Sequence, residues 1–224
     1  VSASGHATRT GLVHEFGLGS DGAWTSQRSF TPLSAQTNDL FGAQISLAGD
    51  YAFVSAPGDQ SRYGSVYVFQ RLQQGGRAGG AAAPPPAAGQ APAGNFTWRE
   101  FSRLTAPVAT MADRFGTAVA ADDREIWVGA PGGGPGRVYA FTAGGTGVLI
   151  GSTRVVSPGW VEAAGIGGAV SLRRGIAAVG ATNFDTGAGG VLIYERHQFG
   201  AWRAHPIITS PLDEMPALAG AEPR

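Results

Sequence analysis

The sequence predicts an all-β protein, a β-propeller made of four-stranded antiparallel blades. Residues 39–69 form a stretch that recurs at 113–141 and, in a more divergent form, at 165–194. Each copy contains short segments rich in β-branched and aromatic residues, and turns rich in Gly, Pro and Asp separate these segments. No stretch has the periodicity of an amphipathic helix. A four-stranded unit that recurs about every 50 residues is typical of a propeller blade.

The unit that contains residues 39–69 is the clearest copy, and it illustrates the four expected strands. They correspond to residues 41–48, 51–57, 64–69 and 98–107. The first strand alternates small and apolar residues, the second ends in the tripeptide Ser55-Ala56-Pro57, the third reads GSVYVF, and the fourth begins at a tryptophan. This alternation, together with the turn residues between the runs, favours strands over helices.

The repeat also predicts the organisation of the chain, as one propeller domain covering residues 1–224. We expect a partial first blade at 1–32, a second at 38–107, a third at 112–158 and a fourth at 163–211. The second blade carries an Ala/Gly/Pro-rich insertion at 75–95, which we expect to be disordered because it has few large apolar groups. Residues 212–224 begin a next blade or form a closing strand. About four repeats are therefore visible, either an excerpt of a seven-bladed ring or a four-bladed ring.

Composition excludes several classes of function. The 16 arginines balance 16 acidic residues, so the net charge gives no support for binding nucleic acid. Cysteine is absent, which excludes disulfides, thiolate metal sites and thiol nucleophiles. No apolar run reaches the length of a transmembrane helix. The chain begins at Val1 with no signal peptide in the sequence, and we expect that any leader has been removed or lies outside this sequence.

A motif recurs at fixed places in the unit, a Phe-Gly pair in the first strand and a Gly-Ala-Pro-like tripeptide at the end of the second. Together with the GxVYxF strand, it resembles the FG-GAP repeat of integrin α-subunit propellers and of exported bacterial proteins. The resemblance implies a non-enzymatic interaction protein outside the cytoplasm, in the periplasm or at the cell surface. The motif residues, which we expect to have structural roles, are Phe41, Gly42, Ala56, Pro57, Phe115, Gly116, Ala130, Pro131, Gly167 and Ala181.

Many FG-GAP blades also hold calcium in an acidic loop between the first two strands. The corresponding loops here are short and lack the alternating carboxylates that calcium requires. We therefore predict no metal site and no cofactor. Asp59 and Asp185, in the loop that follows the tripeptide, are retained as minor calcium candidates.

No catalytic motif is present. The four histidines are scattered, without the spacing of a zinc site, and neither a nucleophile elbow nor a phosphate-binding loop occurs. Trp24, Trp98 and Trp202 recur at one repeat position, which indicates a structural role on the outer strand or between blades. Trp160 lies outside this pattern in an expected connection between blades, and it is an interface candidate.

The adjacent Arg173 and Arg174 occupy an expected turn, and they are further interface candidates. We predict a protein-binding scaffold, an extrinsic subunit of a larger extracytoplasmic or membrane-associated assembly. Its partners would be proteins, including a membrane-protein complex. The alternatives are an adhesion or carbohydrate-binding propeller and a hydrolase with a site in the central channel.

Overall fold

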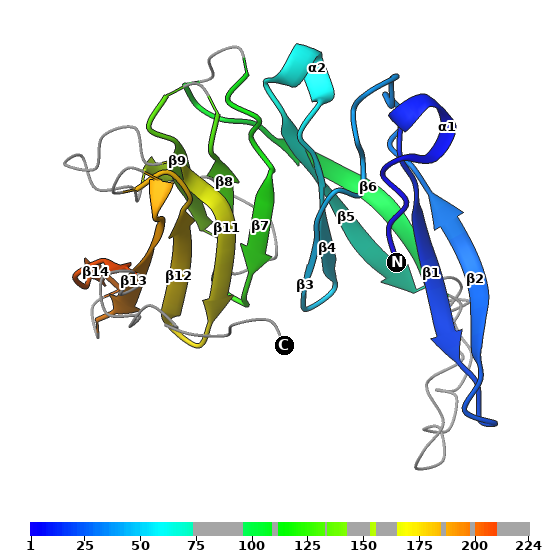
Figure 1. Cartoon of the computed structure of the whole chain (residues 1–224). Helices are drawn as coiled ribbons and strands as arrows, with labels where there is room; N and C mark the ends of the chain where they lie inside the picture. The colour runs from blue at the N-terminus through cyan, green and yellow to red at the C-terminus, as the bar shows by residue number, and fades with distance from the viewer. Residues whose placement is uncertain are drawn as a thin grey trace, which may run out of the picture.

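Four antiparallel sheets follow one another along the chain and are arranged side by side as an arc of blades (Figure 1). The computed structural model describes residues 1–73, 96–108, 112–132, 134–142, 153–155, 165–184, 187–197 and 200–209. The predicted insertion at 75–95 and the final segment 212–224 lie outside the described residues.

Each complete sheet is built from strands that are consecutive in sequence. The first sheet has two strands, β1 (Val13–Leu18) and β2 (Trp24–Phe30). The second contains β3 (Ile45–Ala48), β4 (Tyr51–Ala56), β5 (Ser65–Gln73) and β6 (Phe96–Leu104). The third contains β7 (Ala118–Ala121), β8 (Glu125–Ala130), β9 (Arg137–Thr142) and β10 (Thr153–Val155). The fourth contains β11 (Ile166–Arg173), β12 (Ile176–Ala181), β13 (Gly190–Arg196) and β14 (Trp202–Ala204), and β15 (Ile208–Thr209) pairs with β13.

Two single helical turns interrupt the β structure at equivalent places in the repeat. They are α1 (His6–Arg9), before β1, and α2 (Asp59–Arg62), between β4 and β5. Both lie at the same end of the molecule (Figure 1). The described fold is therefore the all-β, blade-like architecture that the sequence predicts.

The central strands are buried on both faces, against two different neighbouring sheets. In β5, Val66 and Val68 belong to the apolar cluster shared with the third sheet, whereas Tyr67 and Phe69 belong to the cluster shared with the first. Successive side chains of a strand point to opposite faces, so the alternation in sequence divides the side chains between two interfaces. A sheet of this kind has no solvent-facing side and depends on its neighbours.

The sheets are also joined by a backbone hydrogen bond that recurs at every junction. The amide of Phe41 donates to the carbonyl of Thr10 (3.0 Å), that of Phe115 to Tyr63 (2.9 Å) and that of Ile166 to Pro135 (2.9 Å). The glycine that follows each acceptor has a positive φ, 93° at Gly11, 84° at Gly64 and 79° at Gly136. At each of them a Cβ atom would overlap the carbonyl oxygen of the next sheet's Phe or Ile. Glycine is required here both for the backbone conformation and for the close approach.

Within the described residues, the first and last sheets share no strand pairing and lie at opposite ends of the array (Figure 1). Closure into a ring, the number of its blades and the residue limits of each blade stay predictions.

Replacing Gly64 with Ala tests the junction. We expect the variant to lose more than about 3 kcal/mol of unfolding free energy, because the left-handed conformation is unfavourable and the methyl group meets the Phe115 amide nitrogen at 2.6 Å. Urea unfolding measures the loss. Gly22→Ala is the matched control, since Gly22 has φ 79° with no atom within 4 Å of the added Cβ. It should lose only about 1 kcal/mol. Equal losses in the two variants would contradict the close-approach explanation.

Candidate functional site

The Phe-Gly and Gly-Ala-Pro motif residues lie at the contacts between sheets. Phe41 and Phe115 are completely buried. The glycine that follows each Phe, and Ile166 in the fourth sheet, faces the preceding sheet. A Cβ would meet the carbonyl oxygen of Leu12 at 3.2 Å from Gly42, of Ser65 at 2.8 Å from Gly116 and of Arg137 at 2.6 Å from Gly167. The tripeptide alanines pack in the three inter-sheet clusters, Ala56, Ala130 and Ala181 in one cluster each. Their burial gives these motif residues a packing role.

Aromatic pairs accompany the motif in two sheets. The ring of Phe41 lies 5.7 Å from that of Tyr67 in an edge-on arrangement, and Phe115 lies at the same distance from Tyr139. Offset and edge-on geometries are the favourable ones for such rings. These rings fill the interfaces between consecutive sheets.

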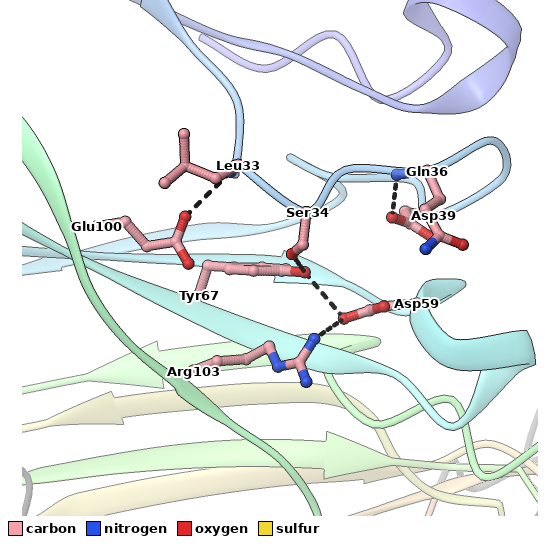
Figure 2. A network of polar contacts seen from close by, with 8 residues as sticks. All are labelled: Leu33, Ser34, Gln36, Asp39, Asp59, Tyr67, Glu100 and Arg103. Atoms are coloured by element: carbon pink, nitrogen blue, oxygen red, sulfur yellow. Dashed lines mark hydrogen bonds and ion pairs between the residues drawn. The ribbon is translucent and has the colours of Figure 1, made fainter.

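Asp59 lies at the centre of a buried polar network (Figure 2). Its carboxylate accepts a hydrogen bond from the Tyr67 hydroxyl (3.0 Å) and is paired with the Arg103 guanidinium (3.3 Å). The Ser34 and Tyr67 hydroxyls are 3.1 Å apart. The network joins the β2–β3 connection, α2, β5 and β6. Burial is the main cause of the raised pKa of the Tyr67 hydroxyl, which keeps the phenol protonated as a donor.

Two further hydrogen bonds hold the β2–β3 connection in place (Figure 2). The Leu33 amide donates to Glu100 on β6 (3.2 Å), and the Gln36 amide donates to the carboxylate of Asp39 (2.6 Å). Asp39 is buried, and this burial is the main cause of its raised pKa. The contacts of Leu33 and Ser34 thus fix the connection to the second sheet, and the Gln36–Asp39 bond closes a turn within it.

Of the two calcium candidates, only Asp59 is described by the structure, since Asp185 lies outside the described residues. The Asp59 carboxylate already has a cation, Arg103, as its partner. In the part of the chain that the structure describes, no group of three or more His, Asp or Glu side chains is arranged to hold a metal ion.

Of the interface candidates, Arg173 is the last residue of β11 and not a turn residue as expected, because it pairs with Ile176 of β12, whereas Arg174 begins the tight turn between the two strands. Both are exposed. Arg174 and Gly175 both have positive φ, 49° and 79°, as a two-residue hairpin turn of the primed type requires. Arg174 lines a cleft of about 500 Å³ together with Asp122 and His197. Trp160 lies outside the described residues, so its predicted interface role stays a prediction.

A cluster around Glu125, at the junction of the third and fourth sheets, was not predicted from the sequence. Glu125 is 6% exposed and accepts hydrogen bonds from the indole nitrogens of Trp127 and Trp202, each at 2.9 Å. Arg196 pairs with the same carboxylate (3.3 Å) and lies over the Trp202 ring. The recurring tryptophan position was visible in the sequence. The carboxylate that binds it was not, because Glu125 and Trp202 are 77 residues apart.

The outer face of the first sheet exposes apolar side chains. Trp24 is 68% exposed, Leu18 46% and Phe16 39%. Phe16 and Trp24 line a cleft of about 380 Å³ with Val1. We expected Trp24 to be structural, like Trp98 and Trp202. In the described residues no sheet covers it, whereas Trp98 packs against Phe30 (6.2 Å) and Trp202 against Trp127 (4.7 Å) of the preceding sheet.

The fold belongs to the class of all-β propellers, because its blades are four-stranded antiparallel sheets that bury their faces only against one another. Comparison with known families agrees, because residues 24–69 and 98–141 match the family model for the FG-GAP repeat. The chain therefore contains FG-GAP repeats. No curated protein matches it. Each matched range begins in the last strand of one sheet, β2 or β6, and ends in the third strand of the next, β5 or β9.

FG-GAP repeats occur in protein-interaction and adhesion propellers, and the family is generally non-enzymatic. Among the described residues, no helix is long and apolar enough to cross a membrane.

High pH should weaken the fold through its buried tyrosines. Burial raises the pKa of the Tyr194 hydroxyl from 10.0 to about 12, so above pH 10 the unfolded chain loses this proton before the folded one does. Unfolding free energy should be constant with respect to this group below pH 10 and should fall between pH 10 and 12. Urea unfolding across that range measures it. In Tyr194→Phe the unfolding free energy should fall less steeply over this pH range. Tyr67 and Tyr139, whose pKa values are also raised, should account for part of the fall that is left. An unchanged slope would contradict the assignment.

Calcium should leave the thermal midpoint of unfolding unchanged, because Arg103 neutralises Asp59. The measurement is a thermal melt with millimolar Ca²⁺ and with EDTA. A midpoint that rises with Ca²⁺, falls with EDTA and loses this response in Asp59→Asn would identify Asp59 as a calcium ligand after all.

Proposed function

We propose that the chain is a non-enzymatic protein-interaction scaffold, an extrinsic subunit of a larger extracytoplasmic or membrane-associated assembly. The observation that carries the proposal is the apolar face of the first sheet, which no sheet covers in the described part of the chain. Three aromatic or aliphatic side chains of β1 and β2 face solvent there, Phe16, Leu18 and Trp24. A contiguous apolar surface of this kind is characteristic of an interaction site.

The repeat itself indicates what kind of surface covers this face. The tryptophan at the equivalent position of the second and fourth sheets packs against an aromatic side chain of the sheet before it. Trp24 presents the same group in the same strand position. The matching occupant is therefore an apolar β-sheet face, which is a protein surface. Tryptophan is also the residue type that most often dominates the energy of such contacts.

The proposed location is supported by the family and not by the geometry. FG-GAP repeat proteins are often extracellular, and we accordingly assign the scaffold to the extracytoplasmic side. The adhesion or carbohydrate-binding alternative needs aromatic side chains exposed at equivalent sites of several blades. Of the three recurring tryptophans, only Trp24 is largely exposed, so the structure favours a protein partner.

Replacing Trp24 with Glu tests the proposal. The protein is purified under mild conditions together with whatever it binds, and native mass spectrometry measures the mass of the intact assembly. We expect the unmodified chain in a complex and the Trp24→Glu chain released from it, because a charge in a desolvated apolar contact is costly. Leu47→Glu is the matched control, since Leu47 on β3 is 65% exposed and lies away from the first sheet. It should keep the assembly.

Two results would contradict the proposal. The first is an unmodified chain that runs alone as a monomer. The second is an assembly that Trp24→Glu and Leu47→Glu disrupt to the same extent.

A further inference from the structure

A cleft of about 600 Å³ opens at the end of the molecule that carries α1 and α2. Three arginines from two sheet junctions line it, Arg9 from the first and Arg62 and Arg114 from the second. Arg9 ends α1, Arg62 ends α2, and Arg114 precedes the buried Phe115 ahead of β7. They are 52 to 105 positions apart in the sequence, and the fold alone brings them to one cleft.

The backbone fixes each of these arginines at a junction. The Arg9 carbonyl accepts a hydrogen bond from the Leu40 amide (2.9 Å), and the Arg62 carbonyl accepts one from the Arg114 amide (3.1 Å). All three have left-handed φ values of 67°, 78° and 54°, which is uncommon for residues other than glycine. The cations are thus attached to well-defined backbone positions, which limits the ordering that binding would require.

The charge of the cleft is not compensated. The three arginine side chains are exposed, and none of them forms an ion pair with a described residue. By contrast, Arg103 and Arg137 are paired with Asp59 and Asp113. One acidic residue lines the cleft, Asp39, and it is buried with its carboxylate bound to the Gln36 amide. Three cations that share one cleft attract an anionic ligand.

The other lining groups favour a peptide over other anions. Gln36, Thr37 and Asn38 lie in the same cleft, and their amide and hydroxyl groups can bond to the main chain of an extended segment. Guanidinium groups bind carboxylates in bidentate geometry. The zero net charge of the whole chain argues against a nucleic acid, whose binding depends on many phosphate contacts.

We propose that this cleft binds an acidic segment of a partner protein, with Arg9, Arg62 and Arg114 as the anchors. The proposal deepens the scaffold function, on which it rests, by adding a second contact separate from the apolar face of β1 and β2. Together the two surfaces would give one partner an apolar and an electrostatic attachment, and the electrostatic contact would determine its orientation.

The test is direct binding of a fluorescently labelled decapeptide of alternating Asp and Gly, measured by fluorescence anisotropy at 50 mM and 150 mM NaCl. The same peptide with Asn in place of Asp is the uncharged probe. We expect the Asp peptide to bind, the Asn peptide not to bind, and affinity to fall as salt rises. The triple variant Arg9→Gln, Arg62→Gln and Arg114→Gln should weaken binding by at least about tenfold.

A second triple variant is the matched control, Arg99→Gln, Arg124→Gln and Arg203→Gln. It removes the same charge from three exposed arginines outside the cleft, and it should change affinity less than about twofold. Circular dichroism checks that both variants are folded. Equal weakening by the two triples, or equal binding of the Asp and Asn peptides, would overturn the proposal.

Two further results would also overturn it. One is the absence of binding at millimolar peptide. The other is tighter binding of a sulfated heparin oligosaccharide that depends on the same three arginines, because the occupant would then be a polysaccharide. Trp24→Glu separates the two proposals. It should leave peptide binding unchanged, so failure of the cleft and failure of the apolar interface are observed independently.

Discussion

The packing of apolar side chains on both faces of the central strands is the constraint on which the rest of the structure depends. In β5, and likewise in β8 and β9, one set of side chains faces the sheet before and the other faces the sheet after. Burial of both faces contributes free energy only when the neighbours are in place. The junction glycines and the recurring backbone hydrogen bond then determine how closely consecutive sheets approach. The Glu125 cluster crosses one such junction, because the Trp202 indole of the fourth sheet donates to the Glu125 carboxylate of the third.

Most of the fold could be predicted from the sequence because its interactions repeat. In the strand Val66, Tyr67, Val68 and Phe69, alternate side chains face the two neighbouring sheets, so four residues predict both interfaces. The same pattern recurs in Val138, Tyr139, Ala140 and Phe141. The Phe-Gly pair, or Ile166-Gly167 in the fourth sheet, marks each junction. This periodicity predicts the strands of one unit. Because the units repeat, it predicts the strands of the other units as well.

The candidate site was much less predictable, since it depends on features that the repeat does not share. The sequence pointed to Asp59 as a metal candidate, whereas the structure pairs it with Arg103, an arginine 44 positions away. Trp24, Trp98 and Trp202 share a repeat position but not an environment, because among the described residues only the last two have a preceding sheet to pack against. The convergence of Arg9, Arg62 and Arg114 follows from left-handed turns, and residue type alone gives no sign of them. The properties of the candidate site therefore depend on residues that differ between copies and on the contacts that these residues make between sheets.

The offset between the matched repeat and the sheet has a consequence for how such chains change during evolution. One FG-GAP match runs from β2 into β5, and so takes its first strand from one blade and its next three from another. A duplication or deletion in this frame would join an outer strand to the inner strands that normally follow it. Every remaining sheet would still contain four strands. The number of blades could thus change by whole units while every sheet stays complete. Blade number could therefore vary between related proteins independently of the surfaces that the blades present.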